Sequence, residues 1–142
     1  MTGLWVLVAV LVAGTAAGLL LRARNGRVRE ARDTVRELPR PVADALDPAS
    51  AVTLVQISTT FCAPCRHAKA VLAPLAERTE GLHHVELDVT NQPEVAQSLS
   101  VLRTPTTIAL APDGRELLRV SGVPKGADLL EALRPHLTLR TS

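Results

Sequence analysis

The sequence predicts an α/β domain, built as a mixed β-sheet with helices on both faces and preceded by one N-terminal transmembrane helix. Two observations lead to this prediction. Residues 4–21 form an uncharged stretch of eighteen residues, which as a helix would be about 27 Å long and would nearly span a bilayer core. From residue 51 onward, strand-like and helix-like patterns alternate and then include a hairpin, an order typical of a mixed sheet covered on both faces.

The uncharged stretch is expected to remain in the protein as a single-pass membrane anchor. A cleaved signal peptide is the alternative, because the small residues at 14–18 suit a signal peptidase, but residues 1–3 lack the basic start of such a peptide. The flank after the stretch carries four arginines, Arg22, Arg24, Arg27 and Arg29. The positive-inside rule places such a flank in the cytoplasm, so the sequence predicts a cytoplasmic domain, with an exported domain as the alternative.

The chain is expected to divide into four parts: an anchor (1–21), a basic connector interrupted by prolines (22–50), a compact domain (51–138) and a short tail (139–142). In the anchor, two glycines have the spacing that lets helices approach closely, so the anchor could pair weakly with that of a second copy: Gly14 and Gly18. In the connector, apolar residues at helical spacing predict a short amphipathic helix: Val28, Ala31, Val35 and Leu38.

The charge of the chain is concentrated beside the anchor. Residues 22–41 contain seven arginines and three acidic residues, whereas the rest of the chain from Val42 onward contains nine basic and eleven acidic residues. A basic segment next to an anchor suits anionic lipid headgroups. The folded part has no basic excess and a single aromatic residue, so nucleic acid is not expected as a partner.

The first elements of the domain are a strand and a helix. Residues 52–58 are a short, apolar, β-branched run, typical of a buried strand. Apolar residues then recur at helical spacing over 65–80, and Gly81 ends the pattern. A short alternating run at 85–87 predicts the second strand.

The second half of the domain is expected to be helix, hairpin and helix. A proline near the first helical position predicts a helix over 91–99. Strands at 106–111 and 116–120 flank a Pro-Asp-Gly turn signal. The last helix has four leucines on one face: Leu129, Leu130, Leu133 and Leu137.

The only two cysteines, Cys62 and Cys65, stand at the junction between the first strand and the first helix. The N-terminus of a helix is the positive end of its dipole and favours a thiolate, which is the reactive form of cysteine. Cys62 lies before the first turn and is expected to be the nucleophile. Cys65 lies one turn in and is expected to be the resolving thiol.

Other uses of two cysteines fit less well. A structural disulfide closing so short a loop would add only about 2 kcal/mol and is rare in a cytosolic domain. No metal is expected, because zinc needs four ligands and the adjacent His83 and His84 cannot both project from one face of a strand. Haem attachment requires a histidine directly after the second cysteine, where this chain has Arg66.

The segment Phe61-Cys62-Ala63-Pro64-Cys65-Arg66, the strand order and Thr104-Pro105 together resemble the thioredoxin family over roughly residues 50–138. The resemblance implies a thioredoxin-like fold and thiol–disulfide oxidoreductase activity, with Pro105 in the cis form opposite the dithiol. It also implies a groove for a substrate chain, formed by Phe61, Ala63, Pro64, Thr104, Pro105 and Gly122. Arg66 stands where the family usually has a basic residue.

Four positions depart from the family pattern. Cys-Ala-Pro-Cys differs by one methyl group from the usual Cys-Gly-Pro-Cys, and Phe61 replaces a tryptophan, either as a shield over the sulfurs or as ordinary packing. Gln56 stands where thioredoxins have a buried carboxylate that assists the resolving thiol, and an amide cannot titrate there. His84 falls where the family has a lysine paired to that carboxylate, so it could serve as a substitute base.

The leading hypothesis is therefore a membrane-tethered protein-disulfide reductase. It would act on protein disulfides, need no cofactor beyond the Cys62–Cys65 disulfide, and receive electrons from a separate donor. One alternative is an exported factor for disulfide exchange or cytochrome maturation. The other is a client-binding module in which the dithiol is a redox-sensitive latch without turnover.

Overall fold

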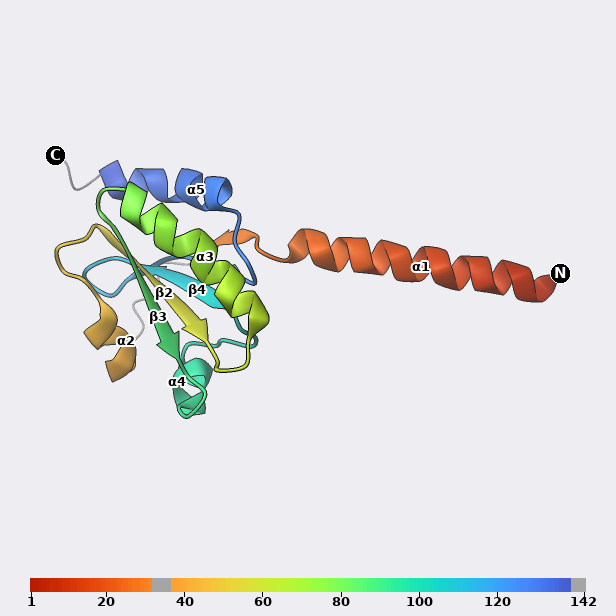
Figure 1. Ribbon diagram of the computed structural model, residues 1–142, viewed down its shortest axis with the longest axis horizontal. Coiled ribbons are helices and arrows are strands. Elements are labelled where there is room, and N and C mark those ends of the chain that lie inside the picture. Colours follow the sequence, from red (N-terminus) through yellow and green to blue (C-terminus); the bar gives the residue numbers. More distant parts are fainter. Residues whose placement is uncertain (32–36, 139–142) are drawn as a thin grey trace.

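The computed structural model describes residues 1–31 and 37–138, in which a long N-terminal helix extends away from an α/β domain (Figure 1). The helix is α1 (Thr2–Arg24), and none of its residues is buried. It is long and apolar enough to cross a membrane. In a lipid bilayer, the apolar side chains of α1 would no longer contact water, and the unfavourable free energy of that contact would be removed.

The domain contains a five-stranded sheet in the order β1-β5-β4-β2-β3. β2 and β3 are parallel, and the other neighbouring strands are antiparallel. The strands are β1 (Val28–Glu30), β2 (Val52–Ser58), β3 (Leu82–Asp88), β4 (Thr106–Leu110) and β5 (Glu116–Ser121). The sheet is therefore mixed, as the sequence predicts.

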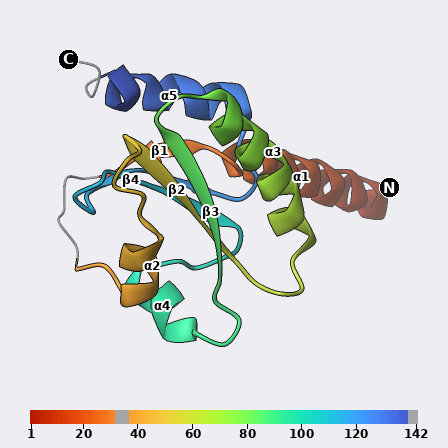
Figure 2. The same ribbon diagram turned by 60° about the vertical axis from the view of Figure 1, so that its left-hand side comes forward.

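Helices cover both faces of this sheet (Figure 2). On one face lie α3 (Ala63–Arg78) and α5 (Gly126–Thr138), whose buried residues join the core cluster that contains Leu54. On the other face lie the short helices α2 (Arg40–Ala45) and α4 (Pro93–Ser98), in the cluster that contains Val55. The core thus consists of two apolar layers separated by the sheet.

β2 is the central strand that positions the candidate site. All seven of its residues are buried, and because side chains alternate across a strand, they fill both layers. Val52 and Leu54 belong to the layer under α3, whereas Val55 and Ile57 belong to the other layer. Gln56 continues the α3 side of this alternation and brings one amide group into an apolar strand.

The segment expected to form a connector helix differs from that expectation. Val28–Glu30 is strand β1, with Val28 opposite Val120 of β5. The Gly26 N–H donates to Ser121 O at 2.8 Å and the Ala31 N–H to Leu117 O at 3.1 Å, which extends the pairing on both sides. Pairing with a sheet edge overrides a helical apolar spacing, since each backbone group gains a partner.

The same segment also contributes to the core. Val42 in α2 is fully buried and packs with Val55 and Ile57, although the sequence placed it in the connector. Val35, a member of the expected connector helix, and the tail at 139–142 lie outside the described residues. The anchor and the domain are therefore joined by chain that is itself part of the folded sheet.

Candidate active site

Cys62 and Cys65 form a disulfide at the start of α3, with their Cα atoms 5.2 Å apart. Cys62 is the N-cap residue of α3, and its Sγ accepts a hydrogen bond from the Cys65 N–H at 3.2 Å. The first turn of a helix has N–H groups without intrahelical partners, and they stabilise a negative charge placed there. Cys62 retains 9% of its surface and Cys65 only 3%, so the first cysteine is the more accessible of the two.

The residues around the cysteines present an exposed rim. Ala63 and Pro64 begin α3, where the missing N–H of a proline costs nothing, and both are exposed, as is Arg66. The Phe61 side chain is 99% exposed. The two interpretations of Phe61, as ordinary packing and as a shield over the sulfurs, are therefore both wrong, and its ring is available to a bound chain.

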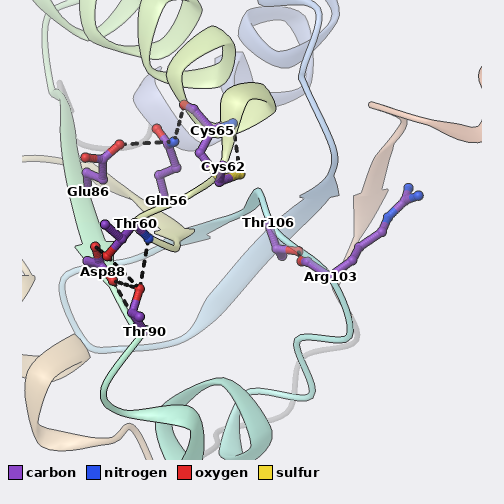
Figure 3. The surroundings of a disulfide bond; sticks show 9 residues. All are labelled: Gln56, Thr60, Cys62, Cys65, Glu86, Asp88, Thr90, Arg103 and Thr106. Carbon is purple, nitrogen blue, oxygen red and sulfur yellow. Dashed lines mark hydrogen bonds between the residues drawn. A yellow bond between two sulfur atoms is a disulfide. The ribbon is translucent and has the colours of Figure 1, made fainter.

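Hydrogen bonds join Thr60, the residue before Phe61 in the sequence, to Thr90 and Asp88 (Figure 3). Thr60 N–H donates to Thr90 Oγ1 at 2.8 Å, and Thr60 Oγ1 lies 3.1 Å from a carboxylate oxygen of Asp88. Hydrogen bonds from Thr90, and a weaker one from Thr60, lower the pKa of Asp88. This cluster was not predicted from the sequence, where its only local signal is the Asp-x-Thr spacing that begins at the last residue of β3.

The Thr104–Pro105 peptide bond is cis, as expected, and Pro105 is buried directly before β4. Pro105 O accepts a hydrogen bond from the Gly122 N–H at 2.8 Å. Gly122 has φ +87°, and a Cβ added to it would clash with Asn25 Oδ1. Two of the expected groove residues therefore touch, and the chain at the end of α1 covers the second of them.

Gln56 lies beneath the dithiol, fully buried (Figure 3). Its Nε2 donates to Cys65 O at 2.8 Å, and its Oε1 lies 3.0 Å from Nε2 of His84. Because a carbonyl can only accept, the Gln56 amide nitrogen must face Cys65, and its oxygen must face His84. His84 therefore carries a proton on Nε2, and a lone pair for proton uptake remains only on Nδ1.

A carboxylate that was not predicted from the sequence also contacts this site. Glu86 is opposite Gln56 in the parallel register of β2 and β3, and its Oε2 lies 3.4 Å from Gln56 Nε2. Lys69 of α3 forms an ion pair with Glu86 at 3.6 Å. Gln56 thus has two titratable neighbours, Glu86 and His84, and within the described residues no hydrogen bond joins either of them to the Cys65 sulfur.

The environment of His84 shifts its titration. Burial lowers the pKa of His84 below its usual value of 6.5, and Lys69 and His83 act in the same direction, while Glu86 opposes them. The folded protein therefore binds this proton less readily than the unfolded chain does. Its stability should fall as the pH drops from about 6.5 through the lowered pKa of the folded state.

We expect His84→Gln to weaken this pH dependence. Glutamine does not titrate but can still donate to Gln56 Oε1, so the variant should lose less stability than the wild type between about pH 7.5 and about pH 5. Urea unfolding of the oxidised full chain in a neutral detergent measures the difference. His67→Gln, on the exposed side of α3, is the matched control and should keep the wild-type dependence. An equal loss in both variants would contradict the assignment.

The thioredoxin family model matches residues 41–135, which include the dithiol and the cis-proline. The chain belongs to the thioredoxin family. A thioredoxin from Staphylococcus aureus is 36% identical over 89 residues, which cover 62% of this chain and 85% of that protein. In this thioredoxin-family chain, α1 and β1 lie before the residues that the family model matches.

Solved thioredoxin structures share the fold. A mutant thioredoxin from Halobacterium salinarum superposes with a TM-score of 0.61 at 22% identity, covering 72% of this chain and 88% of the other. A Fasciola hepatica thioredoxin gives a TM-score of 0.53 at 27% identity, covering 62% and 84%. With this family membership and a Cys-x-x-Cys disulfide, the chain is a thiol–disulfide oxidoreductase.

Proposed function

We propose that the protein is a membrane-tethered protein-disulfide reductase that acts on disulfides close to the membrane surface. The observation that supports this most is the position of the dithiol: the first turn of α3 lies on the side of the domain from which α1 leaves (Figures 1 and 2). Asn25, just after α1, also covers Gly122 of the proposed groove. A client in that groove would lie near the bilayer that holds α1.

In the proposed reaction, the Cys62 thiolate attacks one sulfur of a client disulfide and forms a mixed disulfide. The other client sulfur leaves as a thiolate and takes up a proton. Deprotonated Cys65 then attacks Cys62 Sγ, releases the second client thiol and closes the Cys62–Cys65 disulfide. The client gains two electrons and two protons, and a separate donor returns the dithiol to its reduced form.

The groove would be formed by six residues on two sides of the dithiol. On one side, the exposed ring of Phe61 offers apolar contact to a client chain. On the other side, the backbone around the cis-proline is held by the Pro105–Gly122 hydrogen bond. The proposed set is Phe61, Ala63, Pro64, Thr104, Pro105 and Gly122.

Three residues are proposed to modulate the dithiol. Arg66 adds a positive charge one residue after Cys65, which favours thiolates nearby. Gln56 fixes the Cys65 carbonyl but cannot take up its proton. His84 contacts Gln56 rather than a sulfur, so it would act on the dithiol through that amide. The rate and direction of exchange thus depend on a site without a carboxylate at position 56.

We propose that the domain faces the cytoplasm, because the arginines directly after α1 favour that side. Membrane vesicles of both orientations can be prepared from cells that produce the full chain. They test on which side of the membrane the domain lies and whether it reduces disulfides. Inverted vesicles should catalyse insulin disulfide reduction by a small added dithiol. Right-side-out vesicles should do so only after permeabilisation.

Other outcomes identify the alternatives. Activity in intact right-side-out vesicles would place the domain on the exported side and favour disulfide exchange or cytochrome maturation there. Client binding without turnover in either preparation would favour the redox-sensitive binding module. Release of the active domain from washed membranes would contradict tethering by α1.

A further inference from the structure

We propose that a cavity at the C-terminal end of α1 is a phosphate-binding site, which we call the basic cavity. It has a volume of about 480 Å³, within the range typical of ligand sites. It lies between the end of α1, β1, β5 and the loop before Pro105. Four exposed arginines line it from these separate elements: Arg24, Arg27, Arg29 and Arg103.

These four guanidinium groups have no carboxylate partner among the described residues, where the only ion pairs are Lys69–Glu86 and Arg119–Glu116. Arg103 donates a hydrogen bond of 3.2 Å to Asn25 Oδ1, and this acceptor carries no charge. A guanidinium group donates two parallel hydrogen bonds to a phosphate oxygen pair, so several of them around one cavity suit a phosphate group.

The sheet register adds an independent argument. Arg29 of β1 is directly opposite Arg119 of β5, and like charges at opposed positions destabilise an antiparallel pair. Glu116 neutralises Arg119 with two hydrogen bonds, at 2.8 and 3.1 Å. Nothing in the described part of the chain does the same for Arg29. An anion in the basic cavity would supply the missing negative charge at this point of the sheet.

The position of the cavity favours the headgroup of an anionic phospholipid as the source of the phosphate. Leu21, the last residue of the uncharged stretch in α1, lines the cavity together with Arg24 in the next turn. The boundary between apolar and charged side chains therefore crosses the mouth of the cavity. With α1 in a bilayer, the arginines would lie at the depth of the headgroups, where each basic residue adds about fivefold in affinity for anionic lipid.

A ligand in the basic cavity would also contact the loop that leads to the catalytic side of the domain. Leu102 and Arg103 line both this cavity and a second one of about 460 Å³ that extends to Thr59 and Thr104. The loop that carries them leads directly into Pro105. A bound headgroup would therefore hold the loop that forms one wall of the proposed groove.

NMR titration of the full chain in a neutral, phosphate-free detergent tests the site. Short-chain phosphatidylglycerol is added in one arm and inorganic phosphate in the other, with no client or reductant present. We expect saturable shifts in the amides of residues 24–30 and 100–103. The double variant Arg27→Gln/Arg29→Gln should weaken binding roughly 25-fold, at about fivefold per arginine.

The control is Arg78→Gln/Arg134→Gln, which removes the same charge from helices that do not line the cavity. It should bind as the wild type does. The double variant could lose binding simply because β1 no longer pairs with β5. Arg103→Gln lies outside β1 and should also weaken binding, which separates the two causes. Saturation by phosphatidylglycerol alone identifies a headgroup site, and saturation by both identifies a site open to soluble phosphate.

Absence of saturation in both arms would overturn the proposal, as would an equal loss of binding in the control variant. A lipid headgroup as the source of the phosphate rests on the proposed function, in which α1 is inserted in a membrane. The phosphate site itself does not depend on the dithiol. Failure here would leave insulin reduction by the vesicles unchanged, so the two failures are distinguishable.

Discussion

We expect Cys65→Ser to convert the protein from a turnover enzyme into a covalent trap, whereas Cys62→Ser should abolish both turnover and trapping. Without Cys65, the mixed disulfide on Cys62 has no internal thiol to resolve it. Without Cys62, the remaining thiol is the more buried one, with 3% of its surface exposed. Insulin reduction should fall roughly a thousandfold or more in either variant, as is usual when a covalent nucleophile or its partner is removed.

The geometry of α3 makes Cys65→Ser an informative trap. The hydrogen bond to Cys62 Sγ comes from the backbone N–H of residue 65, and Gln56 donates to its backbone carbonyl. The substitution removes the sulfur and leaves both contacts in place. The nucleophile should therefore keep its environment, and adducts should appear on non-reducing gels of cell membranes.

The double variant Cys62→Ser/Cys65→Ser is the control for the trap and should give no adducts. Adducts on Cys62→Ser as abundant as those on Cys65→Ser would contradict the assignment of Cys62 as the nucleophile. Turnover by Cys65→Ser at the wild-type rate would contradict the dithiol mechanism itself. Either result leaves the family membership intact, since it tests roles rather than fold.

The elements that sequence patterns predicted are those with local signals. The apolar run at 52–58 coincides with β2 (Val52–Ser58), and the pattern at 65–80 corresponds to α3 (Ala63–Arg78). The Pro-Asp-Gly turn separates β4 from β5 as expected. The placement of Cys62 at the start of α3 follows from the same local patterns, because strand, loop and helix are adjacent in the chain.

The features that the sequence did not predict depend on contacts between distant segments. β1 is a strand because an edge of the sheet accepts it, and three residues carry too little pattern to indicate this. Val42 is buried because α2 packs on the core layer that contains Val55, on the opposite face of the sheet from α3. Glu86 joins the site through the parallel register of β2 and β3, which no local spacing determines.

The candidate site divides in the same way. The dithiol and the cis-proline are recognisable from short motifs, and the structure places Gly122 against Pro105. The contribution of Asn25 was missed because it comes from the chain after the anchor, far before Gly122 in the sequence. The anchor and the active site are therefore linked by packing that only the folded chain reveals.

The largest stability effect is expected for Gly26→Ala, at the junction between anchor and domain. Gly26 has φ +76°, and an added Cβ would clash with the backbone oxygen of Val123. A positive φ alone costs an alanine about 1 kcal/mol, and a clash with backbone cannot be relieved by a side-chain rotation. We expect a total loss of about 3 kcal/mol in the free energy of unfolding, measured by urea denaturation in neutral detergent.

Gly81→Ala separates the two causes of this loss. Gly81 has almost the same backbone angle, φ +80°, but the nearest atom to an added Cβ is the Ala51 Cβ at 3.4 Å. It should therefore lose only the cost of the positive φ. The Gly26 N–H donates to Ser121 O, so Gly26→Ala should also lose hydrogen-exchange protection at residues 26 and 31, whereas Gly81→Ala should keep it. Equal destabilisation by the two substitutions would mean that the chain after α1 is not held against the domain, and the groove would then lose the support that Asn25 gives to Gly122.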